Sequence, residues 1–167
     1  MSLNHNSKIS VDKGKMIMRV KYGEIKDEWA LFFTKWPFEW WVTLTFKDPV
    51  DQDLARVRLL DWTRKICVRE KLQLAYMAVY NQRKRGHLHL LMLGRNRYGK
   101  TLRDISIEKC NGYWDDNSLI KPIDNIYGLG SYLSKNLVLR NSDLSDIVLY
   151  NKKLLKKCKI KSGCSHK

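Results

Sequence analysis

Two histidines with a single residue between them are the groups in this sequence best suited to chemistry. His87 and His89 enclose Leu88 at the start of an apolar segment that continues to Leu93. Side chains alternate across a strand, so a strand here would point both imidazoles to one face. Each neutral ring offers a lone pair, and apolar surroundings offer few competing partners. The pair predicts a divalent-metal site; the alternative is two core histidines bonded to nearby backbone.

The elements that must position this pair are predicted as a hairpin. Residues 74–81 and 87–93 have the apolar, β-branched and aromatic content of strands, and the charged residues between them end in Gly86. Another strand is predicted over residues 39–46, after Pro37 ends a helix over residues 24–35. We expect the hairpin to lie near the middle of a sheet.

The remaining elements complete an alternating pattern. Between the first two strands, a helix is predicted to open at Asp48-Pro49 and end near Glu70. The later predictions are helices over residues 101–110, 126–139 and 144–157, and a strand over 119–123. The order β, α, β, β, α, β, α predicts an α+β fold: a ferredoxin-like antiparallel sheet with helices packed mainly on one face.

Three blocks in this order resemble the HUH endonucleases, specifically the rolling-circle replication initiators. The strand Trp-Trp-Val-Thr-Leu-Thr-Phe at residues 40–46 is similar to the opening motif of that family. His87-Leu88-His89 is similar to its histidine-hydrophobic-histidine motif, and Tyr132-x-x-Lys135 is similar to its nucleophile motif. Mobilisation relaxases place the tyrosine before the histidines, whereas here it follows them. The resemblance covers residues 40–139 and implies an HUH endonuclease-like fold.

The resemblance implies that Tyr132 is the nucleophile. A phenol with a pKa of about 10 is mostly protonated at neutral pH and needs a nearby cation to become reactive. Lys135 lies one helical turn further on, so both side chains can reach one phosphate. Tyr127 has the wrong spacing for a paired nucleophile and is interpreted as structural. The alternative for Tyr132 is a core tyrosine.

The resemblance also implies a third metal ligand from the strand before the histidines. Aligning the hairpin with the family pattern puts Asn81 at that position. Gln82 takes its place if the strands pair one residue differently, because such a slip exchanges the two faces. The family commonly has glutamate here, so a neutral amide would bind the cation more weakly. We expect Mn²⁺ or Mg²⁺, held partly by the substrate.

Composition indicates a partner with a phosphate backbone. The chain of 167 residues has 32 Lys and Arg against 17 Asp and Glu, a formal charge of +15. Single-stranded DNA or an origin hairpin is the expected partner, contacted by Arg83, Arg85, Arg95, Arg97 and Lys100. We expect a cytoplasmic protein with no membrane contact, because the sequence has no long apolar run. A host helicase and polymerase would supply unwinding and synthesis.

A rival motif points to nucleotides. Residues 94–101 fit the P-loop pattern G-x-x-x-x-G-K-T after a strand. Too few residues follow it for an NTPase core of alternating βα units, so we interpret it as a chance match. Among the tryptophans, Trp40, Trp41 and Trp114 are the candidates for stacking on bases.

The sequence therefore predicts one catalytic domain with two flanking segments. Residues 1–15 are predicted to be flexible, residues 16–141 to form the nickase domain and residues 142–167 a basic C-terminal helix and tail. The predicted function is a metal-dependent single-strand DNA endonuclease and ligase that starts rolling-circle replication of a plasmid or virus through a 5′-phosphotyrosine. The alternatives are a single-strand DNA transposase of the same superfamily and a DNA-binding protein without catalysis.

Overall fold

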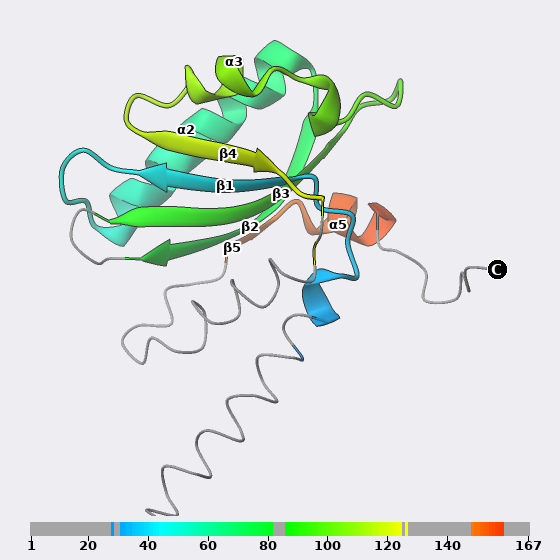
Figure 1. Ribbon diagram of the computed structural model, residues 1–167, viewed down its shortest axis with the longest axis horizontal. Coiled ribbons are helices and arrows are strands. Elements are labelled where there is room, and N and C mark those ends of the chain that lie inside the picture. The colour runs from blue at the N-terminus through cyan, green and yellow to red at the C-terminus, as the bar shows by residue number, and fades with distance from the viewer. Residues whose placement is uncertain (1–27, 29–30, 82–85, 125, 127–147, 159–167) are drawn as a thin grey trace, which may run out of the picture.

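The computed structural model describes residues 28, 31–81, 86–124, 126 and 148–158 (Figure 1). Its elements in chain order are β1 (Trp40–Thr45), α2 (Gln52–Glu70), β2 (Gln73–Asn81), β3 (His87–Arg95), the 3-10 turn η1 (Leu102–Asp104), α3 (Ile107–Asn111), β4 (Ser118–Pro122), β5 (Val148–Tyr150) and α5 (Lys152–Cys158). Within these residues, no helix has the length and apolar character needed to cross a membrane.

The strands form one antiparallel sheet in the order β4-β1-β3-β2-β5. The hairpin strands β2 and β3 pair along their whole length, from Gln73 opposite Arg95 to Asn81 opposite His87. β3 lies between β1 and β2 and is therefore an interior strand, as the sequence predicted. With helices packed on this sheet, the α+β class is confirmed.

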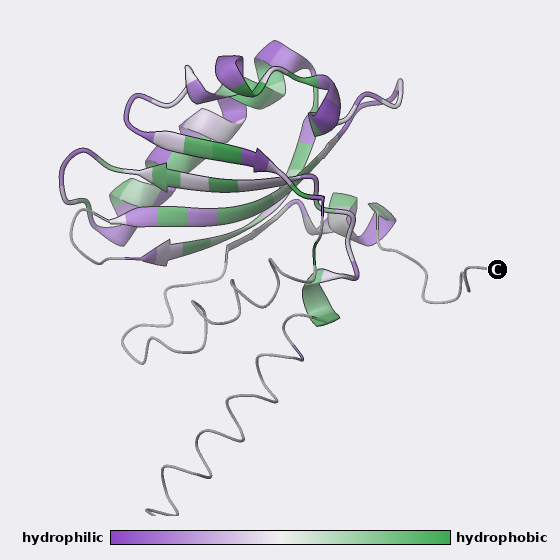
Figure 2. Cartoon of the chain, viewed as in Figure 1, coloured by the Kyte–Doolittle hydropathy of each residue, from purple (hydrophilic) through white to green (hydrophobic). Residues whose placement is uncertain are grey.

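The two faces of the sheet differ in what covers them. On the helix face, which bears Leu88, Leu90 and Met92, α2, η1 and α3 enclose the larger apolar cluster. The opposite side, the histidine face, bears His87 and His89, followed along β3 by Leu91 and Leu93. Figure 2 shows hydrophobic residues in the strands and many hydrophilic ones in the helices above them.

Helix α2 begins where a carboxylate caps it. The side chain of Asp51 accepts a hydrogen bond of 2.7 Å from the backbone N–H of Leu54. The helix therefore begins at Gln52, later than the predicted start at Asp48-Pro49. It ends at Glu70 as predicted, because Lys71 adopts a left-handed conformation with φ of 56°. Leu59, Trp62 and Ile66 recur at helical spacing and are buried against the sheet.

Two other predicted helices are wrong in detail. Residues 101–110 form η1 and α3 with a break between them, because Thr101 and Ser106 each cap a new turn with their side chains. Residues 148–150, predicted as part of a helix over 144–157, pair with β2 as the edge strand β5, and α5 begins only at Lys152. Leu154 of α5 is buried with Phe33 and Met77, so this helix covers part of the histidine face. The predicted helix over 126–139 lies outside the described residues apart from Ile126.

Candidate metal and DNA site

The two imidazoles lie together on the histidine face, as their spacing predicted. Their ring centroids are 4.7 Å apart and the rings meet edge to face at 81°. His89 is buried, with 7% of its surface exposed, whereas His87 at the start of β3 is half-buried. His89 is therefore the more sheltered of the two imidazoles.

Strand β1 flanks the pair with two threonines. Thr43 lies opposite His89 and Thr45 opposite His87 in the antiparallel register. The hydroxyl oxygen of Thr43 is 3.2 Å from Nδ1 of His89, within hydrogen-bond distance. The Trp41 ring stacks on the same imidazole, with centroids 6.3 Å apart and an angle of 25° between planes. His89 therefore has a hydroxyl at one ring nitrogen and an indole beside its ring.

Strand β2 brings an amide to the other side. Asn81 is the direct partner of His87, and residues directly opposite each other in a sheet share a face, with Cβ atoms about 5 Å apart. The Asn81 amide is therefore placed where the aligned hairpin put the third ligand. Gln82, the alternative, lies outside the described residues. Among the residues described, no three His, Cys, Asp or Glu side chains gather into a metal-binding group.

This donor set fits a divalent cation of intermediate hardness. Two imidazole nitrogens and an amide oxygen are neutral ligands that Mn²⁺ accepts, and they leave coordination positions for water or phosphate oxygens. None of these three ligands is a carboxylate, so they leave the full positive charge of a bound ion for an anionic ligand. Such a site would hold the ion weakly by itself and more tightly together with a phosphate.

A glycine fixes the start of β3. Gly86 has φ of +78°, and a Cβ added there would lie 2.7 Å from the hydroxyl oxygen of Tyr80. Its carbonyl accepts a hydrogen bond from the N–H of Phe46, just beyond β1. The residue before His87 therefore has both a backbone conformation and a close contact that favour glycine.

The described basic residues that were predicted to touch DNA lie at the other end of β3. Arg95 lies six positions after His89 along the strand, roughly 20 Å at 3.4 Å per residue. Arg95 is ion-paired with Glu39, and Nζ of Lys100 lies 3.6 Å from a carboxylate oxygen of Glu70. Arg97 is exposed, with its guanidinium 4.6 Å from the centre of the Tyr98 ring. The structure therefore does not bring these side chains to the histidines.

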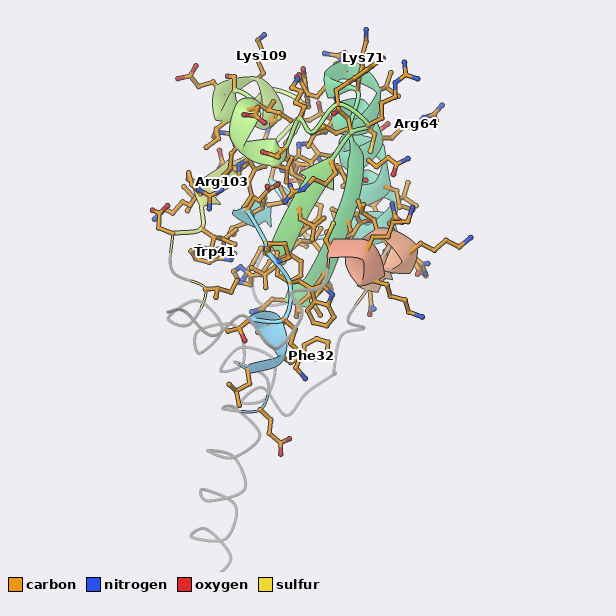
Figure 3. The ribbon with its side chains drawn as sticks, turned by 90° about the vertical axis from the view of Figure 1, so that its right-hand side faces the viewer. Phe32, Trp41, Arg64, Lys71, Arg103 and Lys109 are labelled. Atoms are coloured by element: carbon orange, nitrogen blue, oxygen red, sulfur yellow. The ribbon has the colours of Figure 1, made fainter. Side chains whose placement is uncertain are left out.

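Three other basic side chains lie toward one end of the molecule. Figure 3 shows Lys71, Arg64 and Lys109 at the opposite end of the molecule from Phe32, with Trp41 between. All three basic side chains are exposed. Their spacing in the sequence does not mark them as a group, because only the fold brings α2 next to α3.

The segment that fits the P-loop pattern, residues 94–101, lies around the carboxylate of Glu39. Backbone N–H groups of Gly94 and Leu102 donate hydrogen bonds of 3.2 and 3.1 Å to the same oxygen of Glu39, which is buried. A Cβ on Gly94 would lie 2.9 Å from Cγ of Leu102, so this glycine serves packing. In a nucleotide-binding P-loop, backbone N–H groups such as these would bind phosphate. Here they bind the Glu39 carboxylate, which supports the interpretation of a chance match.

Two of the three tryptophans considered for base stacking are buried. Trp40 has 1% and Trp114 6% of its surface exposed, so both belong to the core and that part of the prediction is wrong. Trp41 is half-buried and stacks on His89. The sequence could not tell which of Trp40 and Trp41 is buried, because alternation along a strand does not show which face the helices cover.

The remaining predicted site residues lie outside the described part of the chain. They are Tyr132 and Lys135 with the structural Tyr127, and Gln82, Arg83 and Arg85 of the hairpin connection. No protein-family model matches this chain, and neither the curated proteins nor the solved structures contain a significant match to it.

Proposed function

We propose that this protein is a metal-dependent endonuclease and ligase for single-stranded DNA, acting as a rolling-circle replication initiator of the HUH type. The observation that carries the proposal is the placement of His87, His89 and Asn81 on one face of adjacent interior strands. Two imidazoles beside an amide offer three neutral donor groups on one face of the sheet. They suit a cation that must also contact a phosphate.

The arrangement of the strands supports the same family. The order β4-β1-β3-β2, with an antiparallel β2–β3 hairpin between β1 and β4 in sequence, is that of a ferredoxin-like sheet. β5 extends that sheet at its β2 edge. The formal charge of +15 supports a polyanionic partner such as DNA. We infer an HUH endonuclease-like domain in which the histidine face receives the strand to be cut.

The proposed reaction exchanges one phosphodiester for another. A cation bound here would withdraw charge from the scissile phosphate and favour ionisation of a nearby phenol. The Tyr132 oxygen attacks phosphorus, the bond to the 3′ oxygen breaks, and that oxygen takes up a proton. The products are a 5′-phosphotyrosine and a free 3′ hydroxyl. Attack by a 3′ hydroxyl reverses the step and rejoins DNA without ATP, and Lys135 would pair with the phosphate during both steps.

The test is formation of a covalent protein–DNA adduct. The full chain is incubated with Mn²⁺ and a pool of labelled single-stranded oligonucleotides, then resolved on a denaturing gel. We expect a shifted band that is lost with EDTA, in Tyr132→Phe and in the double variant His87→Ala/His89→Ala. Tyr98→Phe is the matched control, because its side chain is 78% exposed and lies beyond the far end of β3.

Each other outcome has a distinct meaning. Salt-sensitive DNA binding without a band from any oligonucleotide would favour the DNA-binding protein without catalysis. A band that persists in Tyr132→Phe would assign the nucleophile to another residue, and Tyr127 would be replaced next. A band that survives EDTA and loss of both histidines would remove the metal from the proposal.

A further inference from the structure

His89 is the most constrained of the proposed ligands. Its ring is buried between β1 and β2, where Thr43 and Val79 are its direct cross-strand partners. The Thr43 hydroxyl lies 3.2 Å from Nδ1, and the Trp41 indole stacks on the ring. These contacts fix both the plane of the imidazole and the nitrogen that meets the hydroxyl.

The geometry points to Thr43 as a positioning residue for the metal site: its hydroxyl accepts the Nδ1–H of His89 and directs the lone pair of Nε2 to the cation. This inference rests on the proposed function, because it assigns an outer partner to one proposed ligand. A neutral imidazole has one donor and one acceptor nitrogen, so a bond at Nδ1 determines the state of Nε2.

Thr43 is well placed to hold that bond. β1 pairs with β3 on one side and with β4 on the other, where Thr43 lies opposite Leu119, so its backbone is fixed from both sides. The branched Cβ of threonine restricts χ1, which limits the loss of side-chain freedom on forming the bond. Partners of this kind are typically worth about 10- to 100-fold in metal affinity, although they never touch the ion.

Mn²⁺ affinity in the absence of DNA tests the inference. The full chain is titrated by calorimetry as wild type, Thr43→Val, Thr43→Ser and Thr45→Val. Valine keeps the shape of threonine but has no hydroxyl, so we expect Thr43→Val to weaken binding by about 10- to 100-fold. Serine restores the hydroxyl, so Thr43→Ser is expected to stay within about threefold of wild type, given its freer χ1.

Thr45→Val is the matched control. Thr45 lies on the same strand and face, opposite His87, is equally half-buried, and makes no side-chain hydrogen bond within the described residues. Its replacement is expected to leave Mn²⁺ affinity unchanged. Equal binding by wild type and Thr43→Val would overturn the positioning role and leave the proposed function intact. Failure of the wild type to bind Mn²⁺ both alone and with single-stranded DNA present would instead remove the metal site and the inference with it.

The tautomer of His89 gives a readout that does not depend on metal. Nitrogen NMR of ¹⁵N-histidine protein at about pH 8, where free imidazole is neutral, distinguishes Nδ1–H from Nε2–H, with the signal assigned through a His89→Gln variant. We expect Nδ1–H in the wild type and in Thr43→Ser, and a mixture in Thr43→Val. An Nε2–H tautomer in the metal-free wild type would mean that the hydroxyl donates to Nδ1, which overturns the inference.

Discussion

Asn81 on β2 and His87 on β3 are direct cross-strand partners, and this pair closes the β2–β3 ladder at its hairpin end. The pairing puts a carboxamide beside an imidazole without requiring any motion of the backbone. It also sets the charge of the proposed site, because the third proposed ligand is a neutral amide.

The first prediction concerns that charge. Asn81→Asp is expected to raise Mn²⁺ affinity by at least about tenfold, or about 1.4 kcal/mol, since it adds a negative ligand beside two imidazoles. Asn81→Ala is expected to weaken binding, because it removes an oxygen donor. Calorimetry on the full chain measures both changes.

The control for this pair lies at the other end of the same ladder. Gln73 on β2 is exposed and lies opposite Arg95, so Gln73→Ala should leave Mn²⁺ affinity unchanged. If Asn81→Ala binds Mn²⁺ as tightly as wild type, Asn81 is not a ligand, and Gln82 becomes the residue to replace.

The second prediction concerns Gly86, where an added methyl group costs free energy through both backbone strain and contact with Tyr80. Gly86→Ala is expected to destabilise the protein by clearly more than Gly99→Ala. Both glycines have positive φ, +78° and +86°, so each alanine adopts a left-handed conformation at a cost of about 1–2 kcal/mol. Only at Gly86 does the new methyl also meet the Tyr80 ring, whereas nothing lies within 4 Å of a Cβ at Gly99.

Urea unfolding of the two variants measures the difference directly. The excess loss in Gly86→Ala is the cost of displacing the Tyr80 ring, whose hydroxyl donates to the carbonyl of Val50. Equal losses at the two positions would show that the Tyr80 ring moves without cost and that backbone strain alone explains both.

The strands were predictable because each follows a local rule. Apolar, β-branched and aromatic runs located β1, β2, β3 and β4 to within about two residues, and the alternation of side chains along a strand required that His87 and His89 share a face. The partners of those histidines were not predictable in the same way. Thr43 meets His89 only through the β1–β3 register, which depends on residues more than forty positions apart.

The predicted elements that were wrong have two physical causes. Asp51, Thr101 and Ser106 each satisfy backbone N–H groups with their side chains, and each cap moves a helix boundary that periodicity alone did not define. β5 is a three-residue edge strand held by pairing to β2, and its pattern is too short to distinguish from the helix that follows. The P-loop pattern was interpreted from the sequence as a chance match, and the structure supports that interpretation, because Glu39 accepts hydrogen bonds from the Gly94 and Leu102 N–H groups.

The third prediction follows from that buried carboxylate. Glu39→Ala is expected to lower the free energy of unfolding by about 3–5 kcal/mol, because it leaves the Arg95 charge and the Gly94 and Leu102 amide groups without their acceptor. Glu39→Gln should cost less, since its amide oxygen can still accept both backbone hydrogen bonds and only the ion pair with Arg95 is lost.

Chemical denaturation measures both losses. Asp115→Ala is the control, because this carboxylate is exposed and its replacement should change stability by less than about 0.5 kcal/mol. ATP should bind neither the wild type nor Glu39→Gln. A loss below about 1 kcal/mol in Glu39→Ala would mean that water replaces the carboxylate readily, and the loop would not depend on it.

The fourth prediction concerns thiol reactivity. Burial raises the pKa of the Cys110 thiol from its ordinary 9.0 to about 12, with a smaller contribution from the negative charge of Glu70. The thiolate is the reactive form, so native Cys110 should resist iodoacetamide at about pH 8 and react only as the protein unfolds. Cys158 is half-buried in α5 and should label faster. Mass spectrometry of labelled peptides measures both rates.

The same shift makes a stability prediction with a definite sign. Because the folded state holds the Cys110 proton more tightly than the unfolded chain, the resulting stabilisation is fully present below about pH 9 and is lost as the pH rises toward 12. Wild type should therefore lose more stability than Cys110→Ala when the pH is raised through this window, since other groups titrate alike in the two proteins. Urea unfolding at several alkaline pH values measures the difference. Parallel losses in the two proteins would show that the thiol ionises without opposing the fold, and rapid native labelling of Cys110 would place it in contact with solvent.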